Sequence, residues 1–145
     1  MLKDNPALLD YVTFPGYTAL FRNREGARGG GVGTYINESI QFKSRSDIEM
    51  FQPEMEHLWI EIQGRNKHSK AVIGVIYRSQ RVGLSPPDGL DAFESLLAHL
   101  TASWDGLLLL TGDTNIDMLK PSDKLTKQYR SILEALGCYQ HVQCN

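Results

Sequence analysis

The sequence predicts an α/β protein in which a two-layer β core has helices packed outside it. Three observations predict this class. Strand-like stretches fill the first half of the chain, the run 71–77 is apolar and β-branched throughout, and the second half alternates strands with amphipathic helices. The length of 145 residues suits one domain and is enough to bury a real core.

The first half of the chain is typical of strands joined by turns. Within the stretch 58–62, apolar residues alternate with Trp59 and Glu61, which predicts a strand with one face in the core. The stretch 23–31 is charged and glycine-rich and is expected to be a loop. A short helical turn is predicted at 6–10, a turn at Pro15-Gly16, and strands at 11–14, 17–22, 32–36, 40–43 and 58–62.

The second half contains the most regular patterns. The run 71–77 predicts a central strand buried on both faces. Apolar residues from Leu90 to Leu100 recur at helical spacing, and a core strand is predicted at 107–111. A last helix is outlined from Leu125 to Leu136, with Ser122 or Asp123 placed to cap it and Gly137 to end it; a further strand is predicted to begin at 139–142.

Composition limits the classes of function. The net charge of −2 argues against a chain that wraps nucleic acid through bulk electrostatics, although local contacts by a few Arg and Lys remain compatible with it. No apolar run approaches the length that a membrane span needs, and the first residues do not resemble a signal peptide. A nuclear or cytoplasmic protein without a membrane partner is therefore expected.

The strongest chemical signal is a core strand that leads into Gly112-Asp113-Thr114-Asn115. Because side chains alternate along a strand, Asp113 and Asn115 are expected to point to the same side and Thr114 to the opposite side. A carboxylate there could orient or deprotonate a water, and a carboxamide could donate to a phosphate oxygen. The alternative is that both residues shape a turn, which their types also favour.

Tyr77-Arg78 closes the other core strand and gives a second signal. Both strands are expected to end at one edge of the sheet, where a phenol and a guanidinium could hydrogen-bond a phosphodiester. Taken alone the signal is weak, since a Tyr that closes a core strand usually serves packing.

The glycine-rich stretch 28–33 is a third candidate. It matches neither a Walker loop nor a dinucleotide-binding fingerprint, so a turn that enters the next strand is favoured over a phosphate cradle. Arg22, Arg24 and Arg28 could contact a DNA backbone, or they could form a solvated basic loop.

Metal-binding patterns are incomplete. Cys138, His141 and Cys144 offer three zinc ligands without a fourth, which favours free thiols in a reducing compartment. A calcium-loop interpretation of 113–124 fails because Met118 stands where the loop needs Gly. The histidines show no metal-ligand spacing.

Taken together, these stretches resemble the endonuclease/exonuclease/phosphatase superfamily, which is DNase I-like, and within it the endonuclease domain of non-LTR retrotransposons. The matching segments occur in the family's order and cover nearly the whole chain. They are Pro15-Gly16-Tyr17 with Arg22, then 28–32, 57–62, 74–78 and 109–117.

The resemblance implies a four-layer α/β sandwich and a Mg²⁺-dependent (or Mn²⁺-dependent) enzyme that nicks DNA, in a parent protein that can carry a reverse transcriptase. It implies that Asp113 orients or activates the attacking water, that Asn115 contacts the scissile phosphate, and that Tyr77 supports that phosphate. Substrate contacts by Arg78 and Arg28 are expected beside them.

Two departures from the family's pattern shape the expectation. Thr114 stands where the family has Phe, which is expected to cost packing rather than chemistry. The family's metal-binding Glu strand and its closing Asp-His segment have no counterpart, so residues 1–145 are expected to be a partial domain with weak or no activity, Asp113 being a possible metal ligand. The alternatives are a phosphatase-like member of the superfamily and a non-catalytic interaction module.

Overall fold

A computed structural model describes residues 13–23, 31–66, 69–79 and 90–141. This part of the chain is mixed α/β, with three helices, a two-stranded sheet and a four-stranded sheet. Contacts divide the chain into two compact units. One comprises Met1–Arg78 and Gly106–Thr114, and the other comprises Ser79–Asp105 and Asn115–Asn145.

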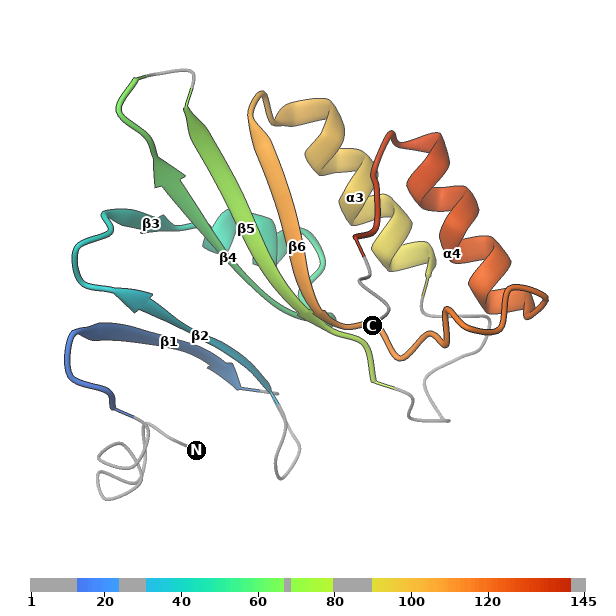
Figure 1. Ribbon diagram of the computed structural model, residues 1–145, viewed down its shortest axis with the longest axis horizontal. Coiled ribbons are helices and arrows are strands. Elements are labelled where there is room, and N and C mark those ends of the chain that lie inside the picture. The colour runs from blue at the N-terminus through green and yellow to red at the C-terminus, as the bar shows by residue number, and fades with distance from the viewer. Residues whose placement is uncertain (1–12, 24–30, 67–68, 80–89, 142–145) are drawn as a thin grey trace. The chain divides into compact units, whose positions relative to one another are not determined.

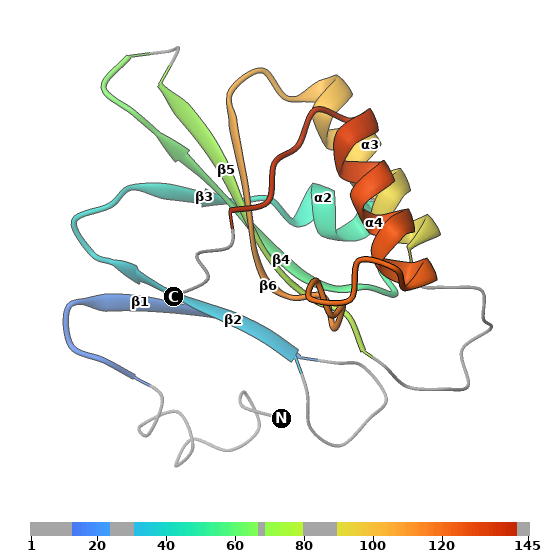
Figure 2. The same ribbon diagram turned by 45° about the vertical axis from the view of Figure 1, so that its right-hand side comes forward.

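The first unit begins with an antiparallel hairpin. Strands β1 (Tyr17–Asn23) and β2 (Gly31–Asn37) pair along their whole length (Figure 2). The predicted turn at Pro15-Gly16 is present, and Gly16 has a φ of 82°, a backbone conformation that glycine adopts without a steric penalty. The hairpin thus confirms the two strands predicted from this part of the sequence.

The four-stranded sheet holds the strands predicted to form the core. Its order is β3 (Phe42–Ser44), β4 (Glu56–Gln63), β5 (Lys70–Tyr77) and β6 (Leu107–Asp113), as Figure 1 shows. The first two pairings are antiparallel, and β5 pairs with β6 in parallel. The sheet is therefore mixed, and the carboxyl ends of β5 and β6 fall at the same edge.

The core of this unit lies between the hairpin and one face of the four-stranded sheet. Val32 and Ile36 of β2 form a buried cluster with Leu58 and Ile60 of β4. The prediction that β4 buries only one face was wrong, because Trp59 on the other face is also fully buried. Partly buried side chains extend the cluster: Leu20, Phe42, Ile62, Ile73, Val75 and Tyr77.

On the opposite face of the sheet, Trp59 lies over β5. Its register partner is Gly74, and a Cβ at that position would clash with the six-membered ring of the indole. Glycine is needed here because the indole occupies the space where a side chain would stand. The prediction that β5 is buried on both faces is confirmed for one face only: Val72, Gly74 and Ile76 are buried, whereas the alternate residues from Ala71 to Tyr77 are partly buried.

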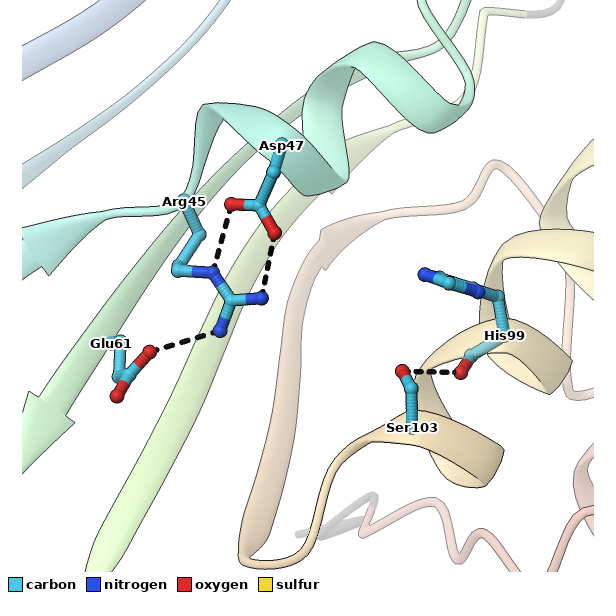
Figure 3. A network of polar contacts seen from close by, with 5 residues as sticks. All are labelled: Arg45, Asp47, Glu61, His99 and Ser103. Atoms are coloured by element: carbon cyan, nitrogen blue, oxygen red, sulfur yellow. Dashed lines mark hydrogen bonds and ion pairs between the residues drawn. The ribbon is translucent and has the colours of Figure 1, made fainter.

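A short helix that the sequence did not reveal, α2 (Ser46–Phe51), precedes β4. Arg45 stands just before it and binds Asp47 through two hydrogen bonds of 2.7 and 2.8 Å, and Glu61 through one of 2.9 Å (Figure 3). The hydrogen bonds with Arg45 lower the pKa of Asp47, and the two carboxylates raise the pKa of Arg45. This network ties the start of α2 to the middle of β4.

Strand β6 differs from its prediction as a buried core strand. Leu107 is 63% exposed and Leu109 is 49% exposed, whereas Leu108 and Leu110 are partly buried. Within the described residues β6 is an edge strand that pairs with β5 alone. An edge position leaves apolar side chains uncovered even where the sequence is uniformly apolar.

The second unit contains helices α3 (Asp91–Ser103) and α4 (Lys124–Ala135), which run alongside each other (Figure 2). The rings of Phe93 and Tyr129 join them, with centroids 5.6 Å apart. Asp123 caps α4 by accepting from the backbone N–H groups of residues 125 and 126, and Gly137, with a φ of 66°, follows its end. Both helices and the caps of α4 were predicted.

Several other predictions were wrong or only partly confirmed. The strand predicted at 40–43 is displaced and shortened to β3, and residues 13–14 and 139–141 are not in strands. Residues 6–12 and 142 lie outside the described part of the chain. Among the described residues, no helix combines the length and the apolar character that crossing a bilayer requires.

Candidate functional site

The carboxyl ends of β5 and β6 form the candidate site. In the parallel register Ile76 is the partner of Gly112, and Tyr77 is the partner of Asp113. Partners in neighbouring strands point to the same face of a sheet, so Tyr77 and Asp113 start from adjacent positions on one face. The prediction that both strands deliver their ends to one edge is confirmed.

Gly112 sets the backbone conformation at the end of β6. Its φ of 127° is one that L side chains rarely adopt, and a Cβ would clash with the carbonyl oxygen of Ile76. Only glycine allows β6 to approach β5 this closely at its end. The glycine before Asp113 therefore sets the direction in which the chain leaves the sheet.

Arg78 joins the ends of the two strands through backbone and side chain. Its backbone N–H donates to the carbonyl oxygen of Asp113 at 2.9 Å, at the point where the two strands end. Its guanidinium Nη1 donates to the carbonyl oxygen of Thr114 at 3.3 Å. Arg78 thus holds the two residues that follow Gly112, a role that its sequence position did not reveal.

Asn115 departs from the expected geometry. Strand β6 ends at Asp113, and Asn115 has a φ of 53°, in the left-handed region that Asn tolerates better than most residues. The alternation of side chains along a strand therefore does not extend from Asp113 to Asn115. In the division of the chain, Thr114 is the last residue of the first unit here and Asn115 belongs to the second.

The groups at these strand ends differ in exposure, and Tyr77 also packs against the core cluster that contains Leu58 and Ile60. Asp113 is exposed, while Tyr77, Arg78 and Thr114 are partly buried. A carboxylate can accept a proton or orient a water, and a phenol can donate to a phosphate oxygen. The ends of β5 and β6 therefore bring together three of the predicted residues: Tyr77, Arg78 and Asp113.

The glycine-rich stretch is described only from Gly31 onward, so Arg24 and Arg28 lie outside the described residues. The backbone N–H of Gly31 donates to Oε2 of Glu56 at 3.1 Å. Arg22 uses its guanidinium to bind backbone carbonyl groups at the start of β4. The carboxylate of Glu56, which accepts from the N–H of Gly31, would repel a phosphate. This favours a turn over a phosphate cradle at Gly31.

No metal centre is formed by the part of the chain that the structure describes. Within it, no group of three His, Cys, Asp or Glu side chains is placed to hold an ion. Of the predicted zinc ligands, Cys138 is partly buried, with its pKa raised by burial, and His141 is exposed, while Cys144 is not described. Asp113 supplies one exposed carboxylate at the strand ends.

No protein-family model, no curated protein and no solved structure matches this chain.

Proposed function

We propose that this chain carries part of the active site of a phosphodiesterase, a DNase I-like endonuclease of the non-LTR retrotransposon type that nicks DNA. The observation that carries the proposal is the pairing of Tyr77 with Asp113 at the carboxyl ends of two parallel strands. Ligands of open α/β sheets bind at the carboxyl ends of their strands, because side chains and loops converge there on a rigid support. The finer fold, a four-layer α/β sandwich, is part of this proposal.

Each proposed role follows from the chemistry of its side chain. Asp113 accepts a hydrogen bond from the attacking water and orients it, or removes its proton, and its exposure gives that water access. Tyr77 donates from its phenol to a non-bridging phosphate oxygen. The contact of Asn115 with the scissile phosphate is implied by the resemblance alone and stays a prediction from the sequence.

The ion implied by the resemblance, Mg²⁺ or Mn²⁺, does not fit the described residues as a resident cofactor, since they lack a group of three ligands. Hydrolysis of this class depends on several groups that act together, so loss of one member reduces the rate far more than its separate contribution suggests. We therefore expect residues 1–145 to nick DNA slowly at most.

A plasmid-nicking assay tests this proposal. Supercoiled plasmid is incubated in Mg²⁺ buffer with the 145-residue chain, and in parallel with its Asp113→Ala variant. We expect slow nicking by the chain and nicking at the background rate in Asp113→Ala. Nicking that Asp113→Ala leaves unchanged would contradict the proposal.

Two further arms separate the alternatives. Turnover of a soluble phosphomonoester by the chain, without DNA nicking, would indicate a phosphatase of the same superfamily instead of an endonuclease. Absence of both activities in a monomeric, cooperatively folded chain would favour an interaction module. Arg65, exposed in the turn between β4 and β5, offers a matched control, since Arg65→Met changes the charge at the opposite end of the sheet.

A further inference from the structure

We propose that Arg78 is a positioning residue that fastens the segment Asp113-Thr114 to the end of β5, and that it is not primarily a phosphate ligand. The sequence favours a phosphate contact, because a guanidinium at a strand end suits an anion. The structure assigns it another partner, the backbone of β6 where that strand ends. The catalytic consequence of this assignment rests on the proposed function.

The end of β6 needs such a clamp for a local reason. The register of β6 with β5 ends at Asp113, and Gly112 has no side chain with which to anchor the turn. A chain end of this kind opens easily, since few bonds must break for it to leave the sheet. The 2.9 Å hydrogen bond from the backbone N–H of Arg78 to the carbonyl oxygen of Asp113 ties Asp113 to the end of β5.

The guanidinium adds a second bond one residue further along. Nη1 of Arg78 donates to the carbonyl of Thr114 at 3.3 Å, joining positions 36 residues apart in the sequence. Because Arg78 and Thr114 are both partly buried, water competes less for this bond than at the open surface. The two bonds hold the backbone on both sides of the Asp113–Thr114 peptide, where Asp113 is the register partner of Tyr77.

The two roles considered for Arg78, a clamp on the backbone of β6 and a ligand for phosphate, predict different experimental results. Lys can replace Arg as a phosphate ligand because its ammonium group is also positively charged. It lacks the planar guanidinium, whose fixed geometry directs one N–H at a chosen carbonyl. A clamp sets the rate of the bound complex, since a small displacement of a catalytic group slows the reaction at unchanged affinity. A phosphate ligand sets the affinity for DNA.

The first experiment needs no activity. Amide hydrogen exchange is measured in the 145-residue chain for wild type, Arg78→Met, Arg78→Lys and the control Arg65→Met. The readout is the exchange rate of the amide at position 78, which donates to Asp113, divided by that of Ile73 in the middle of β5. The ratio corrects for a variant that is destabilised as a whole. We expect it to rise about fivefold or more in both substitutions of Arg78, and to stay constant in the control.

The second experiment measures single-turnover nicking by the 145-residue chain. We expect Arg78→Met and Arg78→Lys to lower the rate at saturating DNA about tenfold to a hundredfold, with the half-saturating DNA concentration changed less than about twofold. An unchanged exchange ratio would overturn the clamp. So would a loss of affinity that Lys restores. If wild type shows no nicking while the exchange ratio rises, the proposed function fails and the clamp stands.

Discussion

Nε1 of Trp59 donates a 2.8 Å hydrogen bond to Nδ1 of His57, and both side chains have no exposed surface. Nδ1 must therefore lack a proton, so the proton of the neutral ring is on Nε2, 2.9 Å from the carbonyl oxygen of Gln52. The two rings meet edge to face, with their planes at 89°. A buried histidine is thus held in one tautomer between the start of β4 and the residue that follows α2.

Protonation of His57 is expected to destabilise the fold. A second ring proton would face the N–H of Trp59, and the new charge would lie near the guanidinium of Arg22, which binds the backbone carbonyl of His57. Burial lowers the pKa of His57, Arg22 lowers it further, and hydrogen bonds at Gln52 and Glu49 partly oppose this. His57 is therefore expected to be neutral in the folded protein.

The sign of the pH dependence follows from that lowered pKa. The folded-state value lies below the unfolded value of 6.5, so the stabilisation is fully present above about pH 6.5 and is lost as the pH falls from there toward the folded-state pKa. Urea unfolding between about pH 7.5 and 5 should show a slope of up to about 1.4 kcal/mol per pH unit in this window. His57→Gln should reduce the slope, whereas His99→Gln should retain it; equal slopes in wild type and His57→Gln would refute the assignment.

Gly74→Ala is expected to lower the free energy of unfolding by about 2 kcal/mol, because the added methyl group would overlap the indole of Trp59 in a packed core. The atoms it meets belong to the six-membered ring of the indole. In a Trp59→Phe background the same substitution should cost less than about 0.5 kcal/mol, and a double-mutant cycle from urea unfolding measures the difference. An equal cost in both backgrounds would mean that the indole is not the obstacle.

Arg22→Met is expected to lower the free energy of unfolding by about 2 kcal/mol, because it removes a charged donor from three backbone carbonyl groups, two of them in part-buried hydrogen bonds. The guanidinium binds the carbonyl oxygens of Pro53, Met55 and His57 at 2.9 to 3.1 Å. Arg65→Met, which removes an exposed arginine, should change stability by less than about 0.5 kcal/mol. Similar losses in both variants would show that the charge, rather than the three carbonyl contacts, matters.

Asp123→Ala is expected to destabilise α4 by about 1 kcal/mol, because its carboxylate accepts from the N–H groups of Leu125 and Thr126 at 3.0 and 3.4 Å. Asp123→Asn keeps an acceptor oxygen and should stay within a few tenths of a kcal/mol of wild type. Urea unfolding followed by the helical circular-dichroism signal measures both. Loss of the same size in the Asn variant would point to the charge instead of the cap.

The elements that sequence patterns predicted are those with strong local signals. Helix α4 has an amphipathic stripe and a cap at each end, Asp123 and Gly137, and its bounds matched closely. Strand β5 is rich in β-branched and apolar residues along most of its length. Helix α2 was missed because its six residues are too few to display a periodic pattern.

The features that sequence could not supply depend on long-range neighbours. The exposure of Leu107 and Leu109 follows from the edge position of β6, which no local pattern encodes. At the candidate site, the shared edge of β5 and β6 was predicted, but the left-handed backbone of Asn115 and the bond from Arg78 to Thr114 were not. Both arise at or just beyond the end of β6, where local sequence patterns stop.

The parallel pairing of β5 with β6 also sets an order of folding. Strands β4 and β5 are joined by a short turn, whereas Arg78 meets Thr114 across 36 positions of sequence. Closing the longer loop costs more chain entropy, so the antiparallel pair is expected to form early and β6 to add late. The residues that would perform the chemistry are then among the last to be assembled, and any variant that slows the docking of β6 delays the site while leaving most of the sheet in place.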